Sequence, residues 1–246
     1  MKISAKIIFF VIAMIIVSVS VIAGLSVIEN TGYNETISYE RVTSASRDLT
    51  GKIEGMLESS ERSAVSIAQN FRLVAALEKN SFDELKAVLD DINSYLKMDT
   101  ISITDTEGNI VIRQHEPAKF GDNILKQSNV QNALKGEVST TLEPGALVKL
   151  SCRSGAPIYN AGGAVIGTVV TGFTFENTAI LDELKALHNT EMTIFAGTES
   201  IATTIMQDGQ RVAEMTLGDE IAKTVLESGN PYTGNADVFG EPYITK

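Results

Sequence analysis

The sequence predicts an α+β protein with an N-terminal transmembrane helix, a long stalk helix and two tandem units, each built on an antiparallel sheet. Three observations lead to this fold class. An uncharged apolar run opens the chain, a helical period of three to four residues follows it, and period-two alternation then recurs in two separate stretches. The order of the predicted elements repeats at an offset of about 92 residues, which indicates two copies of one unit.

The apolar run covers residues 7–28 and contains no charged residue. About 20 such residues span a bilayer as a helix. Lys2 and Lys6 precede the run and Glu29 follows it, so the positive-inside rule predicts a cytoplasmic segment 1–6 and an extracytoplasmic remainder at the inner membrane. The alternative is a cleaved signal peptide, although the run is long for the apolar core of one.

Residues 29–75 are predicted to form the long stalk helix. Apolar residues recur there in helical steps, at Val42, Ala45, Leu49, Ile53, Met56, Ala64, Ile67 and Phe71. This stripe fits a helix that packs on its own domain, and it also fits a membrane-rooted stalk that pairs with a second copy. We expect both, with a homodimer formed through the half of the helix near the membrane.

The first unit is predicted over residues 76–175. Ser81 is a candidate N-cap for a helix that ends near Leu96, and TISITDTEGNIVIRQ then reads as strand, turn and strand. A short helix over residues 128–134 ends before Gly136. Strands are predicted within residues 137–143, 146–159 and 164–175, which completes an antiparallel sheet of about five strands.

A linking helix is predicted over residues 176–189, and a second unit over residues 190–246. Strands within 192–197 and 200–206, a helix over 219–226 and strands within 230–240 and 241–246 repeat the order of the first unit. By that comparison the second unit is truncated, because the strands that close the first sheet have no counterpart before Lys246.

Composition excludes several classes of function. The net charge of −11 argues against a nucleic-acid partner, because a phosphate backbone requires a basic surface. Cys152 is the single cysteine and there are two histidines, so we expect no internal disulfide, no multi-histidine metal site and no cofactor. A thiol nucleophile made from Cys152 and His115 is disfavoured because the two residues are predicted to face opposite sides of their strands. We therefore expect a protein that is not an enzyme.

Five residues form the candidate ligand site. Alternation places Arg113 and His115 on one face of their strand, and it places Lys149, Ser151 and Arg153 on one face of another. If these faces coincide, four potential cations and a hydroxyl converge in an acidic protein, which favours binding of an anion such as a carboxylate. The alternative is a solvated strand face, with Glu116 and Glu143 available to neutralise the cations.

At these residues the sequence resembles a known family. HEPAKFGDN (residues 115–123) and LEPGALVKLSCRSGAPIYNAGGAVIGTVVTGFTF (residues 142–175) resemble the membrane-distal module of double Cache sensors in bacterial and archaeal chemoreceptors. MTIFAGTESIATTIMQDGQRV and ESGNPYTGNADVFGEPYIT look like the membrane-proximal module. The resemblance implies two PAS-like sheets behind a long helix, and an extracytoplasmic sensor that signals through membrane helices.

The first module also resembles the citrate-sensing domains of two-component kinases. That resemblance implies that His115 and Arg153 contact ligand carboxylates, while Arg113, Lys149 and Ser151 are added from strand facing. Cys152 stands where such domains more often have leucine, on the opposite strand face. In the second module, Tyr243 and Thr245 correspond to Ser151 and Arg153.

Three classes of function remain. The first is the sensor region of a chemoreceptor that binds a small organic carboxylate in its distal module. The second is the same sensor joined to a histidine kinase or a cyclase, which only sequence beyond Lys246 would distinguish. The third is a pilin-like structural subunit, which the missing processing site and the missing early glutamate disfavour. The residues do not identify the ligand.

Overall fold

The computed structural model describes residues 16–20, 31–143 and 150–246. They form two compact units. The central unit comprises residues 54–143 and 151–174, and the terminal unit comprises the described residues of 16–53, residue 150 and residues 175–246. Helices and antiparallel sheets alternate along both units, which confirms the predicted α+β class.

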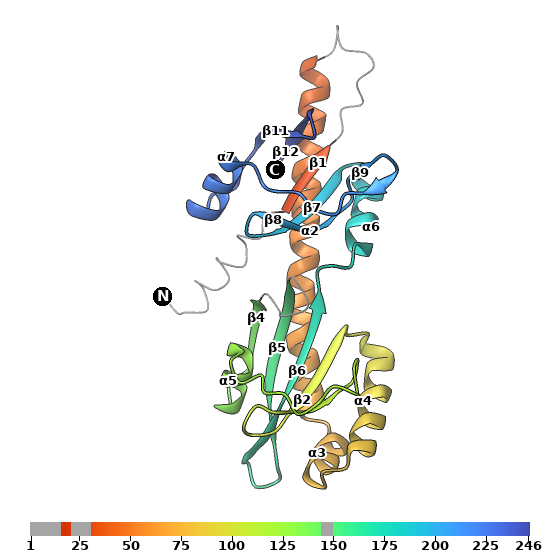
Figure 1. Ribbon diagram of the computed structural model, residues 1–246, viewed down its shortest axis with the longest axis vertical. Helices are drawn as coiled ribbons and strands as arrows, with labels where there is room; N and C mark the ends of the chain where they lie inside the picture. Colours follow the sequence, from red (N-terminus) through yellow and green to blue (C-terminus); the bar gives the residue numbers. More distant parts are fainter. Residues whose placement is uncertain (1–15, 21–30, 144–149) are drawn as a thin grey trace. The chain divides into compact units, whose positions relative to one another are not determined.

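The described strands of the central unit form one antiparallel sheet in the order β3-β2-β6-β5-β4. Their bounds are β2 (Thr100–Thr104), β3 (Ile110–Arg113), β4 (Ser139–Glu143), β5 (Ser151–Tyr159) and β6 (Val165–Thr174). Helices α3 (Phe71–Glu78) and α4 (Phe82–Leu96) lie on the side of β2 and β3, and α5 (Ser128–Leu134) lies beside β4 and β5 (Figure 1). The strands and helices predicted from the sequence are present, with shifts of a few residues at their ends.

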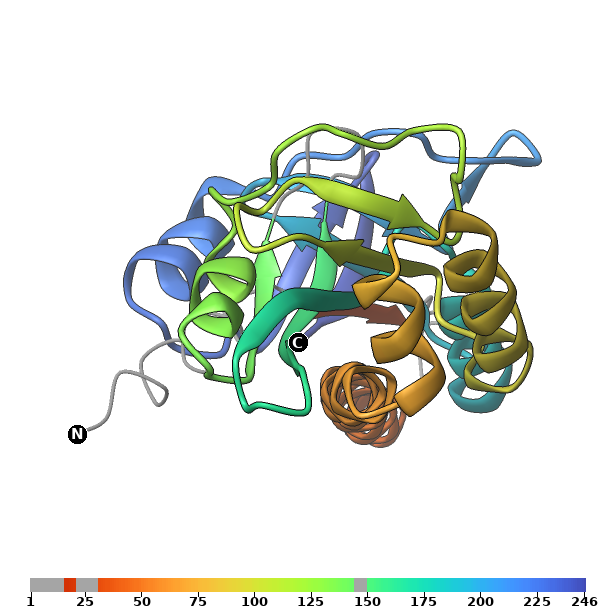
Figure 2. The ribbon, with the colours of Figure 1, turned by 90° about the horizontal axis from the view of Figure 1, so that it is seen from below.

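One face of this sheet packs against α2 (Thr31–Ala68), α3 and α4, and we call it the α2 face. Figure 2 shows α2 end-on, with α3 next to it. The buried side chains of this core come from strands and helices alike: Ala64, Ile67, Leu73, Leu85, Leu89, Ile101, Ile103, Ile112, Ile158 and Val169. Burial of each large aliphatic side chain contributes roughly 1.5–3 kcal/mol, so this face supplies most of the unit's stability.

A polar contact crosses the same core. The Ser60 hydroxyl on α2 lies 3.1 Å from the Thr171 hydroxyl on β6, and Thr171 Oγ1 donates a hydrogen bond of 2.8 Å to the Ser60 carbonyl. Both residues are fully buried. The contact therefore fixes α2 against the middle of the sheet at one defined position.

The terminal unit repeats this topology. Its described strands follow the order β11-β12-β1-β7-β8, with bounds β1 (Ile16–Ser20), β7 (Glu191–Ala196), β8 (Glu199–Thr203), β11 (Gly234–Val238) and β12 (Glu241–Thr245). Helix α6 (Ala179–His188) precedes the sheet. A short hairpin, β9 (Met206–Gln207) and β10 (Gln210–Arg211), and the helical turns α7 (Asp219–Ala222) and η1 (Lys223–Glu227) lie between β8 and β11. The repeat of elements predicted from the sequence is thus present, with β1 standing where β6 stands in the central unit.

Strand β1 differs from the sequence prediction. The prediction of a transmembrane helix covers residues 7–28, but the five of those residues that the structure describes form a strand that is antiparallel to both β7 and β12. The segment IVSVS alternates β-branched residues with serine, a pattern that suits a strand, and the edges of β7 and β12 provide hydrogen-bonding partners on both sides. The other residues of the predicted span lie outside the described part of the chain.

Among the described helices, none combines the length and the apolar composition needed to cross a bilayer.

The predicted stalk helix over residues 29–75 is two helices. α2 ends at Ala68 and α3 begins at Phe71, because Asn70 acts as an N-cap: its Oδ1 accepts hydrogen bonds from the backbone N–H groups of Arg72 (3.0 Å) and Leu73 (3.2 Å). The break turns Phe71 out of the predicted stripe, and Phe71 is 79% exposed.

Apart from the half-buried Met56, the rest of the predicted stripe is buried within the chain itself. Val42, Ala45 and Leu49 are 0% exposed and belong to the terminal unit, and Ala64 and Ile67 belong to the core of the central unit. Of the two alternatives for this stripe, packing on the chain's own domains is therefore the one observed. A second copy would have to contact another face of α2.

We predict that Asn70→Ala destabilises the central unit by about 1 kcal/mol, because two backbone N–H groups at the start of α3 lose their acceptor. Urea denaturation followed by circular dichroism measures the change. Gln69→Ala, at an exposed neighbouring position, is the matched control and should alter stability by less than half as much. Equal stability of both variants would show that the cap is not what separates α2 from α3.

Cys152 lies on the α2 face and is fully buried. Desolvation raises the pKa of its thiol to about 11, although a hydrogen bond with Ser60 acts in the opposite direction. The thiolate is the reactive form, so the folded chain should be alkylated by iodoacetamide at pH 8 at least about two orders of magnitude more slowly than the urea-unfolded chain. Comparable rates in the two states would contradict the buried, neutral thiol.

Candidate functional site

The opposite face of the central sheet, which we call the α5 face, carries mostly polar side chains. Strand register defines it: residues that pair directly across antiparallel strands point to the same side. Arg153 pairs with Thr141 on β4 and with Gly172 on β6, and Gly172 pairs in turn with Thr100 on β2. The same register assigns the following residues to this face: Thr100, Ser102, Thr104, Arg113, Ser139, Thr141, Ser151, Arg153, Gly155, Thr168, Val170, Gly172 and Thr174.

Helix α5 approaches this face very closely at Gly155. A Cβ atom at Gly155 would lie 2.3 Å from the carbonyl oxygen of Asn129 and 3.3 Å from its Cβ. Any larger residue would collide with the backbone of α5, so glycine is required at this point. The close approach sets Asn129 directly above β5, two residues along the strand from Arg153.

Several buried polar atoms on and above this face have no hydrogen-bond partner. They are both side-chain amide atoms of Asn129, the hydroxyls of Thr141 and Ser151, and Oε1 of Gln127. Asn129 is 0% exposed, and Ser151 and Thr141 are 4% and 9% exposed. An unsatisfied buried polar group costs roughly 1–3 kcal/mol, and native proteins rarely contain several together. The grouping makes this face a candidate site for a molecule that supplies the missing partners.

Arg153 is half-buried between these groups. Its Cγ lies 3.5 Å from the position that a Cβ on Gly172 would occupy, and the hydroxyl of Thr100 lies 2.9 Å from the same position. The absence of a side chain at Gly172 leaves room for the aliphatic part of Arg153 to cross β6. The aliphatic part of Arg153 therefore lies beside Gly172 on the α5 face.

Arg113 shares the α5 face, but it serves a different contact. Its guanidinium forms two hydrogen bonds to the Asp122 carboxylate, at 2.6 and 2.7 Å, and a third to the carbonyl of Lys119 at 2.9 Å. This arrangement lowers the pKa of the Asp122 carboxyl, chiefly through the hydrogen bonds from Arg113. With its side chain only 16% exposed, Arg113 is neutralised internally and holds the loop after β3 in place. It also lies three strands from Arg153, or about 14 Å.

His115 lies two residues after Arg113. The pairing with β2 continues past Arg113, because the backbone N–H of Gln114 donates to the carbonyl of Ile101. His115 therefore lies across from Thr100. The residue is exposed. Desolvation by neighbouring atoms lowers the pKa of its imidazole, and the Glu116 carboxylate opposes the shift. Glu116 is itself paired with Lys119 at 2.8 Å. His115 is therefore mainly neutral at pH 7.

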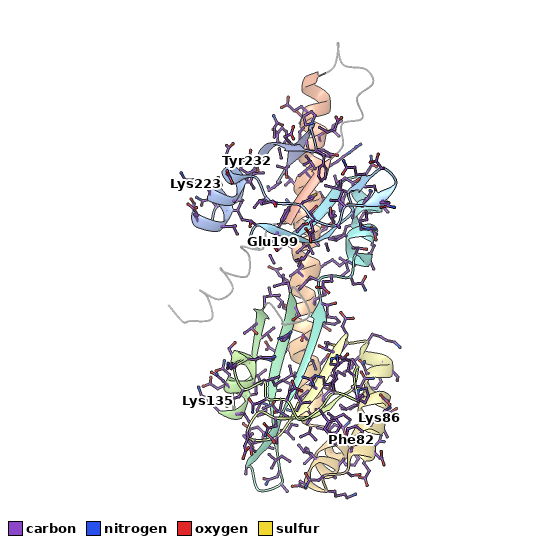
Figure 3. All side chains as sticks on the ribbon, viewed as in Figure 1. Phe82, Lys86, Lys135, Glu199, Lys223 and Tyr232 are labelled. Carbon is purple, nitrogen blue, oxygen red and sulfur yellow. The ribbon has the colours of Figure 1, made fainter. Side chains whose placement is uncertain are left out.

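The segment that carries His115 is fixed to α4. The ring of Phe82 lies 6.1 Å from that of Phe120, and Lys86 pairs with Asp90 at 2.6 Å. Asp90 also accepts a hydrogen bond of 3.0 Å from the side chain of Gln114. Figure 3 labels Phe82 and Lys86, which lie one turn apart on α4. These contacts determine where the chain runs as it leaves β3.

The structure thus brings Ser151 and Arg153 together and places Arg113 and His115 at the other side of the sheet. Lys149 lies outside the described residues. Sequence reasoning missed Asn129 and Thr141. Asn129 had a detectable signal, because it occupies an apolar stripe of its helix with Val130 and Ala133, where a polar residue is unexpected.

In the terminal unit, Tyr243 and Thr245 correspond to Ser151 and Arg153 through the internal repeat, and both lie on β12. Thr245 is buried and its hydroxyl has no partner. Tyr243 packs on a small apolar cluster with Phe195 and Ile221, and desolvation raises the pKa of its phenol, with a further contribution from the Glu191 carboxylate. Arg211 and Lys185 pair with Asp182 and Glu191. In the described part of this unit, the cations near α6 are therefore engaged in ion pairs.

The remaining chemical possibilities are limited. Cys152 and His115 lie on opposite faces of the sheet, as predicted, so they do not form a nucleophile and base pair. Within the described residues, no cluster of histidine, cysteine or acidic side chains has the arrangement of a metal site.

Comparison with known proteins agrees with this architecture. Residues 27–246 match the family described as the double sensory domain of two-component sensor kinases, dCache_3. No curated protein sequence matches the chain.

Solved structures share its fold at low sequence identity. The sensor domain of the V. cholerae histidine kinase DctB is 14% identical and aligns over 71% of this chain and 69% of that chain, with a TM-score of 0.56. The sensory domain of the Campylobacter jejuni chemoreceptor Tlp3 with isoleucine bound is also 14% identical, over 90% of this chain and 91% of that chain, with a TM-score of 0.52.

The V. cholerae LuxQ periplasmic domain is 15% identical over 83% of this chain and 97% of that chain, with a TM-score of 0.51. The resemblance to double Cache sensors is therefore confirmed, and the chain belongs to the family of double sensory domains of two-component sensor kinases.

Proposed function

We propose that this chain is the extracytoplasmic, ligand-binding sensor of a transmembrane chemoreceptor, and that it binds a small organic carboxylate on the α5 face of the central unit. One observation carries the proposal. Arg153 lies on that face among the buried, unpartnered polar groups of Asn129, Thr141 and Ser151. A carboxylate accepts charge-assisted hydrogen bonds from a guanidinium and also accepts from hydroxyls and amides.

Among the candidate cations, Arg153 is the main anchor of this site. Arg113 is already paired with Asp122, so its role is to position the loop that borders the site. His115 has a lowered pKa and contributes charge only when the pH falls below its ordinary value of 6.5, or when a bound carboxylate raises that pKa again. Lys149 remains part of the proposed site because strand alternation assigns it to the face of Ser151 and Arg153.

The receptor context is supported by proteins with the same fold. DctB is a histidine kinase, and Tlp3 is a chemoreceptor whose sensory domain has been solved with isoleucine bound. The LuxQ domain is periplasmic, which supports an extracytoplasmic sensor at the inner membrane. The second candidate is a sensor on a histidine kinase, and the description of the matched family favours it.

Signalling from this site is proposed to pass to α2 through β6. Gly172 borders Arg153 on the α5 face, and the adjacent Thr171 contacts Ser60 of α2 on the other face. A ligand that displaces β6 thus acts on the buried hydroxyl contact that fixes α2 against the sheet. The shift in equilibrium is limited to the ligand's differential affinity for the two positions, typically about 1–3 kcal/mol.

Replacing Arg153 with alanine should weaken carboxylate binding by about one to two decades, because a charge-assisted hydrogen bond to a carboxylate contributes roughly 1.5–3 kcal/mol. Calorimetric titration with mono-, di- and tricarboxylates measures the effect. Cys152→Leu, on the α2 face of the same strand, is the matched control and should bind as tightly as the wild type. Unchanged affinity in Arg153→Ala, or a preference for uncharged or cationic ligands, would refute the proposed site.

A homodimer through α2 is proposed to use an exposed face of the helix. A shallow depression of about 460 Å³ on this helix is lined by Thr36, Tyr39, Glu40, Thr43, Ser44 and Arg47. In membranes, with Cys152 replaced by leucine, Arg47→Cys should form oxidative crosslinks between copies. Leu49→Cys should not, because Leu49 is 0% exposed. No crosslinking at Arg47 or at other exposed positions of α2 would argue against pairing through this helix.

A further inference from the structure

We infer that two polar pairs between α2 and α6 form a register lock, which holds α2 at one position along its axis within the terminal unit. The order of charges along each helix makes the lock specific for that position. The inference concerns the ligand-free chain and does not depend on what binds to the α5 face.

The lock consists of four side chains on α2 and α6, all within the terminal unit (Figure 1). The carboxylate of Asp48 lies 2.8 Å from Nε2 of His188, and Nζ of Lys52 lies 3.1 Å from the carboxylate of Glu183. Asp48 and Lys52 are one turn apart on α2, and their partners follow in the reverse order on α6. The two helices are therefore antiparallel at this contact, with one pair at each turn.

The contact between His188 and Asp48 does not require a charged imidazole. Nε2 carries a proton in the charged form and in one of the neutral tautomers, and in both it donates to the carboxylate. The side chain of His188 is 13% exposed, which makes this the more buried of the two pairs.

Helix α6 is the fixed partner in this contact. Lys185 pairs with Glu191 of β7 at 2.6 Å, and Arg211 of β10 pairs with Asp182 at 2.8 Å. These contacts attach α6 to the strands and occupy two of its four ionisable side chains. The other two, Glu183 and His188, are the ones that face α2.

The apolar stripe of α2 does not define this position by itself. Val42, Ala45, Leu49 and Ile53 are buried and recur at each turn of the helix. A displacement of α2 by one turn, about 5.4 Å, would bring one apolar side chain to the place of another. Polar residues are a usual means by which helices with repeating apolar stripes are held in one register.

A displacement by one turn in either direction removes both pairs. Toward the N-terminal end of α2 it brings Lys52 to His188, and toward the C-terminal end it brings Asp48 to the Glu183 carboxylate. Both shifted positions leave the native partners without their counter-charge. Exposed ion pairs contribute little to the free energy of unfolding, so the lock selects a position rather than stabilising the fold. A helix held in this way moves between discrete positions instead of sliding gradually.

The test uses variants of the full chain that keep both pairs but change the order of charges. In the single-pair exchange, Lys52→Glu is combined with Glu183→Lys, so each contact still joins opposite groups. A displacement by one turn now retains one pair, because the introduced glutamate meets His188 or the introduced lysine meets Asp48. The four-charge exchange adds Asp48→Lys and His188→Glu, which restores the alternating order.

Spin labels on cysteines at Arg41 and Leu187, both exposed, measure the position of α2 along α6. Cys152 is replaced by leucine, and labelled chains are diluted with unlabelled ones so that distances within one chain are recorded. The native sequence and the four-charge exchange should each give one distance. The single-pair exchange should add a second population, shifted by about 3–5 Å because α2 has moved by one turn.

Arg62→Glu is the matched control. It also replaces an i,i+4 ion pair on α2, the one with Glu58, by two like charges, but it lies outside the lock. One distance in the single-pair exchange overturns the inference, and so does a second population in the control or in the four-charge exchange. Comparison of the single-pair exchange with the control decides the inference even if the four-charge exchange does not fold.

Discussion

The central unit depends on the alternation of side chains along β5. Cys152 and Ala156 point to the α2 face and enter the apolar core, while Ser151 and Arg153 point to the α5 face. A shift of one residue in register would exchange these two sets and bury a guanidinium among isoleucines. The contact of Gly155 with α5 holds the register, because no other residue of the strand could take its position beneath the helix.

The two faces of the sheet make opposite contributions to stability. The α2 face is dense with buried aliphatic side chains, and its hydroxyls at Ser60 and Thr171 pair with each other. The α5 face has hydroxyls and an amide that remain unpaired. Proteins commonly tolerate such local losses where function requires them and compensate for them in the core. Under the proposed function, ligand binding is the event that completes the polar face.

Under the proposed function, the same division offers a route by which a small ligand affects a long helix. Consecutive residues of β6, Thr171 and Gly172, touch α2 on one face and border Arg153 on the other. A strand is stiff along its length and presents successive residues to opposite sides, so displacement at one face is transmitted directly to the other. The buried hydroxyl pair gives α2 one preferred position. A second position of α2 would require the contact between Ser60 and Thr171 to break.

The sequence by itself determined the order of the elements and the faces of the strands. The alternation around Arg153, the helix over residues 82–96 and the internal repeat are local or periodic signals, and local signals survive folding. The pairing of Arg113 with Asp122 is different, because the eight loop residues between them must fold back before the carboxylate meets the guanidinium. Strand facing alone therefore counted Arg113 as a ligand group.

Other features depended on contacts between distant segments, so the tertiary structure decided them. Asn70 divides the long helix because the backbone N–H groups of α3 need an acceptor there, and an apolar stripe does not reveal such a cap. The segment of residues 16–20 has a composition that suits either a membrane helix or a strand, and the neighbouring edges of β7 and β12 select the strand. Asn129 became a candidate only when Gly155 brought α5 onto the sheet, because an unpaired amide is recognised from its surroundings and not from its identity.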